Sequence, residues 1–148
     1  GRFLSERLFS PLGLAHTSVA PPEEVRGRAA AANPAHPALL SSARDLAVFA
    51  QMLLNRGVYD HRRYFKPETV DRFTGPRGSW SRQFLPDRAG GGFSPAAFGH
   101  RSDSGPLLWI DPERKLFVVL LANAARNGTP VPEAQKTVCE SVLAALRE

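Results

Sequence analysis

Two apolar runs near the C-terminal end constrain the fold of this chain more than any other feature. Leu107 to Ile110 and Leu116 to Leu121 are rich in the aliphatic, β-branched and aromatic residues typical of strands, and Asp111 to Lys115 separates them. Because a proline that follows an aspartate favours a turn, the two runs predict a β-hairpin. The second run is apolar at both alternating sets of positions, so both faces of its strand must be covered.

Two segments predict helices with one apolar face. Glu133 to Leu146 carries an apolar stripe at helical spacing, and such a helix can cover one face of the hairpin. The residues of this stripe are Cys139, Val142, Leu143 and Leu146. A second helix is predicted over Ala43 to Asn55, with Ser42 as its N-cap and Gly57 as its left-handed stop. Its apolar face must also be buried.

The remaining segments are shorter or irregular. Phe3 to Phe9 predicts a short amphipathic helix that Pro11 must end, and Pro67 to Phe73 predicts another short helix with proline in its first turn. Pro21 to Pro37 lacks a clean period and is interpreted as an irregular connection. Gly75 to Pro95 is rich in Gly, Pro, Ser and Arg, which predicts a long exposed loop.

Composition excludes several classes of protein. The chain has 148 residues, of which 43% are hydrophobic and 22% charged, so it has enough apolar residues to build a core and is not intrinsically disordered. Its longest apolar run, Leu116 to Ala122, is far too short to span a membrane. The single cysteine excludes an internal disulfide, and the histidines lack metal-ligand spacing, so neither a metal nor a cofactor is predicted.

The net charge of +5 raises the question of an anionic partner. The densest basic cluster is His61-Arg62-Arg63, and Tyr59 and Tyr64 are the aromatic residues beside it. Because nucleic-acid surfaces usually interleave basic and aromatic residues more extensively, we interpret the cluster as a solvated surface and predict no nucleic-acid partner.

Four segments occur in an order and spacing that are similar to a known family. They are Phe9 to Thr17, His36 to Leu46, Phe98 to Glu113 and Leu116 to Asn123. They resemble, in turn, the patterns PLG-Met-x-x-Thr, HAGLFST-x-x-DL, FGH-TGFTG-x-x-LWIDPE and LFVVLLTN. These patterns are typical of the serine β-lactamase and penicillin-binding-protein-like hydrolases, in the class C-related branch of esterases and peptidases.

The resemblance implies an α+β fold, in which helices flank an antiparallel sheet. The chain would form the C-terminal portion of one β-lactamase-related domain. Residues 1–97 would supply mainly helices and loops, and residues 98–148 would supply sheet strands and the C-terminal helix.

The resemblance also implies acyl transfer through a covalent intermediate. A serine in a Ser-x-x-Lys motif attacks a carbonyl, and the lysine and a tyrosine of a Tyr-x-Asn/Ser motif move the proton. No serine of this chain has a lysine three residues later, and neither Tyr59 nor Tyr64 has Asn or Ser two residues later. We therefore expect these groups to lie upstream of Gly1, and we predict that this chain alone is inactive.

The active-site element that the chain is expected to retain is the third motif, a Lys/His-Thr-Gly triplet on the sheet edge that faces the nucleophile. The match is His100-Arg101-Ser102, of which His100 alone agrees. From the residue alone, His100 would be interpreted as a surface or loop histidine. The family pattern implies instead that His100 is a catalytic position and that the backbone N–H of Asp103 is an oxyanion-hole donor.

In the same pattern, substrate would also contact Arg101, Ser102 and Ser104. The edge departs from the pattern at three successive positions, Arg101, Ser102 and Asp103, and Ser104 stands where the family has threonine. Arg101 replaces a hydroxyl with a long cation, and Ser102 adds a side chain where the family has glycine. Asp103 would bring a carboxylate close to a developing oxyanion, which is an unfavourable contact between like charges. We therefore expect this sheet edge to support catalysis poorly even in a full-length protein.

Two functions stay open at this point. In the first, the chain is part of a serine hydrolase that acts on a small-molecule or peptide acyl substrate (an ester, an amide or a β-lactam) once an N-terminal half completes it. In the second, it is a non-catalytic interaction module derived from such a hydrolase, because an unpaired hydrophobic sheet edge is a docking surface.

Overall fold

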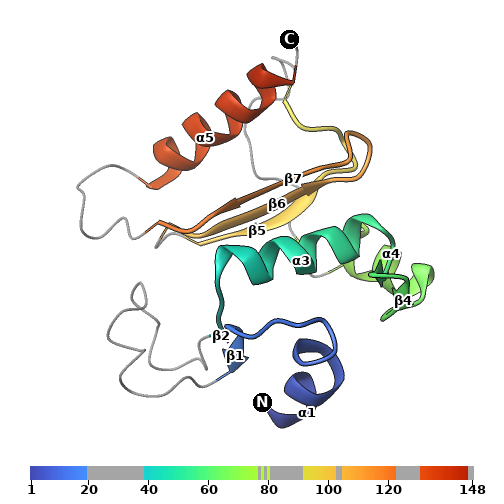
Figure 1. The fold of residues 1–148 in the computed structure, drawn as a ribbon. Coiled ribbons are helices and arrows are strands. Elements are labelled where there is room, and N and C mark those ends of the chain that lie inside the picture. Colours follow the sequence, from blue (N-terminus) through green and yellow to red (C-terminus); the bar gives the residue numbers. More distant parts are fainter. Residues whose placement is uncertain are drawn as a thin grey trace.

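A three-stranded antiparallel sheet lies at the centre of the structure, a computed structural model (Figure 1). The structure describes residues 1–19, 39–76, 78, 80, 92–102, 105–122 and 131–146, without the side chains of residues 131 and 132. The strands are β5 (Phe98–Arg101), β6 (Leu107–Asp111) and β7 (Leu116–Leu120), in the order β5-β6-β7. Strands β6 and β7 form the hairpin that the sequence predicts.

Helices cover both faces of this sheet, as the apolar pattern of β7 requires. Figure 1 shows α5 (Val131–Ala145) on one side and α3 (Ala43–Leu54) on the other. Side chains alternate along β6: Leu107 and Trp109 pack in a cluster with Cys139 of α5, whereas Leu108 and Ile110 pack in a cluster with α3. The α+β class is therefore confirmed.

Local interactions set both ends of α3. At its start the Ser42 hydroxyl accepts a hydrogen bond from the backbone N–H of Asp45 at 3.2 Å, as the capping pattern predicts. After its end, Arg56 and Gly57 have positive φ values of 51° and 91°. A Cβ on Gly57 would lie 2.2 Å from the Phe65 carbonyl oxygen, so both the conformation and the space require glycine.

The C-terminal helix matches its prediction except at its last residue. Cys139 and Leu143 are buried, with 0% and 5% of their surfaces exposed. Leu146 was predicted on the same stripe, but it follows the end of the helix at Ala145 and is 55% exposed. The prediction for Leu146 is therefore wrong.

The N-terminal segment is helical, but most of it stays outside the core. It forms α1 (Arg2–Leu4) and a π-helical turn, η1 (Ser5–Phe9). Phe9 is buried, whereas Phe3 is 72% exposed, so the predicted amphipathic face is buried at its end alone.

A hairpin that the sequence did not predict lies between α3 and α4 (Pro67–Thr74). Its strands, β3 (Val58–Tyr59) and β4 (Arg62–Arg63), are joined by two residues with positive φ, Asp60 and His61. Such turns usually carry glycine or asparagine, and that signal is absent here.

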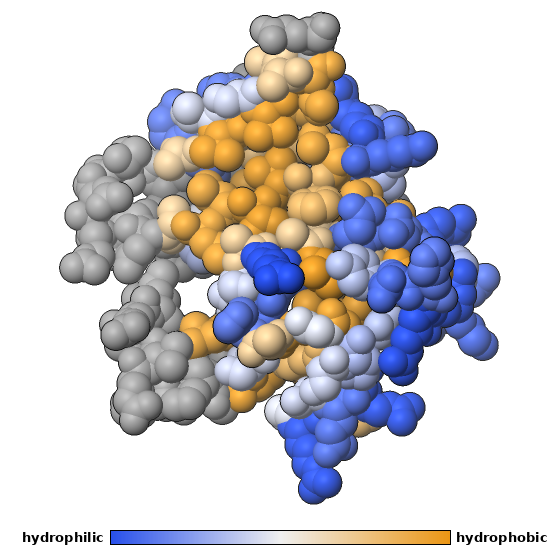
Figure 2. Space-filling view, in the orientation of Figure 1, coloured by the Kyte–Doolittle hydropathy of each residue, from blue (hydrophilic) through white to orange (hydrophobic). Residues whose placement is uncertain are grey.

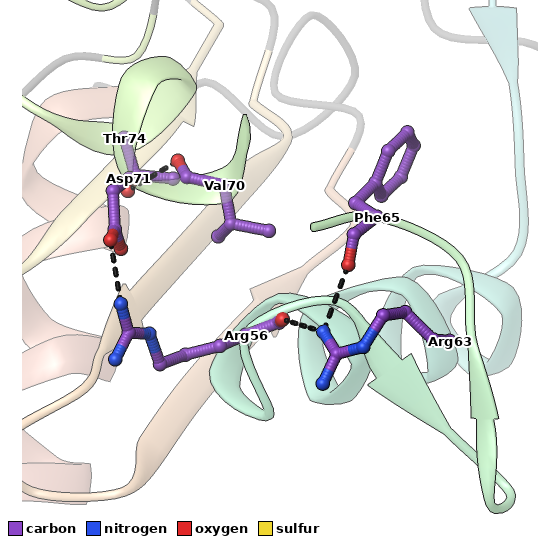
Figure 3. Close-up of polar contacts among 6 residues, drawn as sticks. All are labelled: Arg56, Arg63, Phe65, Val70, Asp71 and Thr74. Atoms are coloured by element: carbon purple, nitrogen blue, oxygen red, sulfur yellow. Dashed lines mark hydrogen bonds and ion pairs between the residues drawn. The ribbon is translucent and has the colours of Figure 1, made fainter. Parts of the chain in front are cut away.

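Polar contacts join this hairpin and the two helices that flank it (Figure 3). The Arg56 guanidinium, after the end of α3, lies 2.6 Å from a carboxylate oxygen of Asp71 in α4. Arg63 donates from Nη1 to the carbonyl oxygens of Arg56 at 3.2 Å and Phe65 at 3.0 Å. The Arg63 guanidinium therefore has a structural role, because it joins two backbone carbonyl groups of this region.

A short pair of strands completes the described structure, in which β1 (Ser18–Val19) pairs with β2 (Leu39–Leu40). The predicted irregular connection from Pro21 to Pro37, and most of the predicted loop from Gly75 to Pro95, lie outside the described residues. Among the helices that the structure describes, none has the length and apolar character needed to cross a membrane.

Candidate functional site

His100 lies at the exposed end of β5, an outer strand of the three-stranded sheet. Phe98 and Gly99 at the start of the strand are buried, and His100 and Arg101 are exposed. Because side chains alternate across a sheet, His100 shares with Phe98 the face on which α3 packs, and Arg101 is on the face of α5. An exposed imidazole at a strand end is accessible to a substrate.

Close packing against β6 fixes the strand that carries His100. Gly99 pairs with Trp109, and His100 pairs with Leu108. A Cβ on Gly99 would lie 2.2 Å from the Trp109 ring and 2.3 Å from the Leu108 carbonyl oxygen. The glycine therefore lets the two strands and the indole ring approach closely, and this contact sets the position of the next residue.

The strand continues into a turn whose two ends are hydrogen-bonded to each other. The Ser102 N–H donates to the Pro106 carbonyl oxygen at 2.8 Å, and the Gly105 N–H donates to the Ser102 carbonyl oxygen at 3.1 Å. Gly105 has a φ of 124°, and a Cβ there would lie 2.3 Å from the Ala122 carbonyl oxygen. Asp103 and Ser104 lie outside the described residues, so their assigned roles stay predictions.

Gln135 of α5 makes hydrogen bonds to the same turn from the side of the core. Its Nε2 donates to the carbonyl oxygens of Gly105 at 3.0 Å and Ser102 at 3.1 Å, with Pro106 further away at 3.4 Å. The residue is 1% exposed. Sequence reasoning missed it, although a signal was present: Gln135 precedes Cys139 by four residues, which places a polar side chain on an apolar stripe.

A buried carboxylate organises the turn at the other end of the hairpin. Asp111 is fully buried and accepts hydrogen bonds from the Ser94 N–H at 2.7 Å and the Ser94 hydroxyl at 2.6 Å. It also accepts from the N–H groups of Glu113 and Arg114, each at 3.1 Å. A carboxylate with so many donors has a structural role in the turn.

A second buried carboxylate joins the first two segments of the family resemblance. Asp45 accepts hydrogen bonds from the His16 N–H and the Thr17 hydroxyl, both at 2.8 Å. The hydroxyl oxygens of Thr17 and Ser41 are also 2.8 Å apart. These groups hold the segment before β1 against the start of α3.

Neither a metal centre nor a reactive thiol is found in the part of the chain that the structure describes. No three His, Cys, Asp or Glu side chains there are close enough to hold a metal ion. Burial raises the pKa of the Cys139 thiol to about 11, and the Glu140 carboxylate contributes further to this increase. Because the thiolate is the nucleophilic form, Cys139 is inert near neutral pH.

Comparison with known proteins identifies the family. Residues 1–138 match the family model described as Beta-lactamase. The chain belongs to the Beta-lactamase family. The resemblance of the four sequence segments is thereby confirmed, and the chain is a serine-hydrolase-like part of a β-lactamase-related protein.

One curated protein is similar to most of this chain. The chain is 33% identical to an N-acetylmuramyl-L-alanine amidase of Bacillus subtilis over 120 residues, which are 71% of this chain and 26% of the amidase. It therefore spans about a quarter of the length of that curated relative.

Solved structures agree in fold. A β-lactamase of Mycobacterium bovis superposes with a TM-score of 0.65 at 22% identity, over 98% of this chain and 56% of that protein. A penicillin-binding-protein homologue of Caulobacter crescentus gives a TM-score of 0.60 at 21% identity, over 83% of this chain and 46% of that protein. At these identities the likeness concerns the fold alone.

Proposed function

We propose that this chain forms the substrate-facing sheet edge of a serine hydrolase whose attacking serine belongs to another part of the polypeptide. The complete enzyme would form an acyl intermediate with an ester, amide or β-lactam substrate. The observation that carries the proposal is the placement of His100, which is exposed at the end of an outer strand and held there by the close contact of Gly99 with Trp109.

The chemistry of the residues supports a site in which one segment supplies the serine and this chain supplies the sheet edge. A serine hydroxyl is a weak nucleophile unless a neighbouring base accepts its proton, and no serine of this chain is in a Ser-x-x-Lys motif. The imidazole of His100 is suited to a different task, which is to hydrogen-bond substrate next to the oxyanion-hole edge. The relative named N-acetylmuramyl-L-alanine amidase suggests that the substrate is an amide.

The test compares two histidine substitutions in the full-length protein that carries this chain. His100→Ala should lower kcat/KM for a chromogenic ester by about 100-fold, as expected for the loss of one preorganised donor at a developing charge. His61→Ala, in the exposed turn between β3 and β4, should leave kcat/KM unchanged. Equal activity of His100→Ala and the unmodified protein would contradict the proposal.

The apolar edge of the sheet supports a second candidate, the non-catalytic interaction module. β7 is an outer strand, its residues are all apolar and mostly half-buried, and Leu121 after it is 45% exposed. Figure 2 shows apolar residues gathered on the face where α5 and the sheet lie in Figure 1. An exposed strand of this composition can pair with another strand.

Binding and turnover distinguish the two candidates. Leu121→Lys should weaken association of this chain with a separately expressed N-terminal half, because it places a charge beside the apolar edge. Leu39→Lys, at an exposed leucine of β2, is the matched control. Association without any ester turnover favours the interaction module, and association that restores turnover favours the hydrolase.

A further inference from the structure

The β3–β4 hairpin and α4 form a basic projection beyond the C-terminal end of α3. Figure 1 shows both elements at this end, and Figure 2 shows hydrophilic residues gathered on the same side. Residues 56–73 contain five Lys or Arg residues against three Asp or Glu residues. The side chains of all of them are exposed. The cations of this projection are Arg56, Arg62, Arg63, Lys66 and Arg72.

Most of these cations have no carboxylate beside them. Arg56 pairs with Asp71 at 2.6 Å, which cancels one charge of each sign. The other four cations form no ion pair in the part of the chain that the structure describes. Asp60 and Glu68 are the two remaining acids of the segment, so the unpaired cations exceed the acids by two.

Two of the unpaired guanidinium groups are held in place by groups that carry no negative charge. Arg62 lies 5.2 Å from the centre of the Tyr64 ring, which is a cation–π contact. Arg63 donates from Nη1 to the carbonyl oxygens of Arg56 and Phe65, and no described group accepts from its Nε or Nη2 (Figure 3). A guanidinium group fixed in this way loses little side-chain entropy when it donates paired hydrogen bonds to a phosphate.

An exposed aromatic ring lies on the same projection. Phe73, near the end of α4, is 41% exposed, and its ring meets the Phe65 ring edge to face with 6.2 Å between the centroids. Arg72, one of the unpaired cations, precedes it. Cations beside an exposed aromatic ring are typical of surfaces that lie on an anionic bilayer, where the cations meet lipid phosphates and the ring enters the apolar boundary.

We propose that the basic projection docks this protein on the surface of an anionic phospholipid bilayer. A projecting surface fits an extended layer of phosphate groups, whereas a single small ligand is usually bound in a concave site. Because the cations exceed the acids by only two, attraction of charge is not sufficient, and insertion of Phe73 is the second contribution. The proposal is independent of the proposed function, since none of its residues belongs to the His100 edge.

The experiment measures how much of the full-length protein sediments with vesicles. One set of vesicles contains equal amounts of phosphatidylglycerol and phosphatidylcholine, and the other contains phosphatidylcholine alone. We expect binding to the anionic vesicles only, and its loss when NaCl is raised from about 0.1 M to about 1 M, because the screening length falls from about 10 Å to about 3 Å.

Three results of this measurement would overturn the proposal. They are equal binding to the two sets of vesicles, binding that salt does not weaken, and binding to soluble polyphosphate without binding to anionic vesicles. The first two would indicate adsorption through an apolar surface such as β7, and the third would assign the projection to a soluble polyanion.

Removal of single charges tests whether the projection itself makes the contact. Lys66→Gln and Arg72→Gln should each lower the partition coefficient for anionic vesicles by about five-fold, which corresponds to about 1 kcal/mol per cation near the surface. Lys136→Gln is the matched control, because it removes the same charge from α5, on the opposite face of the sheet from α3. Its partition coefficient should change by less than about two-fold. An equal decrease in Lys136→Gln would show that binding follows net charge alone, which would contradict the proposal.

A second pair of variants tests the aromatic contribution. Phe73→Ser should lower the partition coefficient by about five- to ten-fold, as expected when an aromatic ring no longer leaves water. Phe3→Ser, at a ring of α1 that is 72% exposed, should leave it unchanged. All the substituted side chains lie at least partly in solvent, and thermal melts followed by circular dichroism verify that each variant is folded. A folded Phe73→Ser protein that binds as the unmodified protein does would overturn the proposal.

Discussion

Three buried polar side chains, Asp45, Asp111 and Gln135, each connect segments that are far apart in sequence. Each is at most 3% exposed, and each makes at least one hydrogen bond to a backbone group. A buried polar group that loses its partners costs more than the bond itself was worth, so these positions hold turns in a single geometry. Two of them lie at opposite ends of the β6 region and fix the turns on either side of that strand.

Asp111→Ala should be strongly destabilising. The substitution removes a fully buried acceptor from the N–H groups of Ser94, Glu113 and Arg114, and we expect the free energy of unfolding to fall by about 3 kcal/mol. Glu113→Ala, at the exposed neighbour, should change it by less than about 0.5 kcal/mol. Urea denaturation followed by circular dichroism measures both. Equal effects would show that the carboxylate does not organise the turn.

The thiol of Cys139 gives a pH dependence with a definite sign. Its pKa is about 11 in the fold against an ordinary value of 9.0, so the folded state favours the protonated thiol. Its contribution to stability is present in full below pH 9 and is lost as the pH rises from 9 to 11. Over that interval the unmodified protein should therefore lose more stability than Cys139→Ala. A parallel loss in both proteins would contradict this prediction.

At the scale of elements, the sequence predicted those whose pattern is local. The β6–β7 hairpin and the helices α3, α4 and α5 follow from apolar periodicity, capping residues and the Asp111-Pro112 turn. The β3–β4 hairpin was missed because Asp60 and His61 adopt positive φ without glycine. The roles of the Gln135 amide and the Asp45 carboxylate were missed because their partners are 28 or more residues away, which no local pattern reveals.

The site of His100 depended on a different kind of information. Four residues of β5 are too few to predict a strand from alternation, and the resemblance to the family located this segment instead. The structure adds the reason for glycine at position 99, because a Cβ there would lie too close to the Trp109 ring. The assigned roles of His100, Arg101, Ser102, Asp103 and Ser104 remain predictions.

The packing of α5 on the sheet can be tested with two leucines of the same helix segment. Leu143→Ala should lower the free energy of unfolding by about 3 kcal/mol, because the side chain is 5% exposed and its loss leaves a cavity. Leu146→Ala removes the same atoms from a side chain that is 55% exposed, and the change should stay below about 1 kcal/mol. A loss of unfolding free energy at Leu146→Ala as large as that at Leu143→Ala would indicate that Leu146 is buried with the stripe after all.

At the scale of the whole molecule, the described chain has a sheet that is covered on both faces and open at its two outer strands. β5 presents His100 at one side, and β7 presents an apolar strand at the other. Under the proposed function, the β5 edge would meet substrate and the β7 edge would pair with the remaining polypeptide.

Mapping the serine that reacts with a fluorophosphonate probe tests this division most directly. The full-length protein and the isolated 148-residue chain are each treated with the probe, digested and analysed by mass spectrometry. Our account predicts one labelled serine in the full-length protein, in a peptide outside residues 1–148, and no label on the isolated chain. A labelled serine within residues 1–148 of either sample would contradict the claim that this chain supplies the sheet edge while another segment supplies the nucleophile.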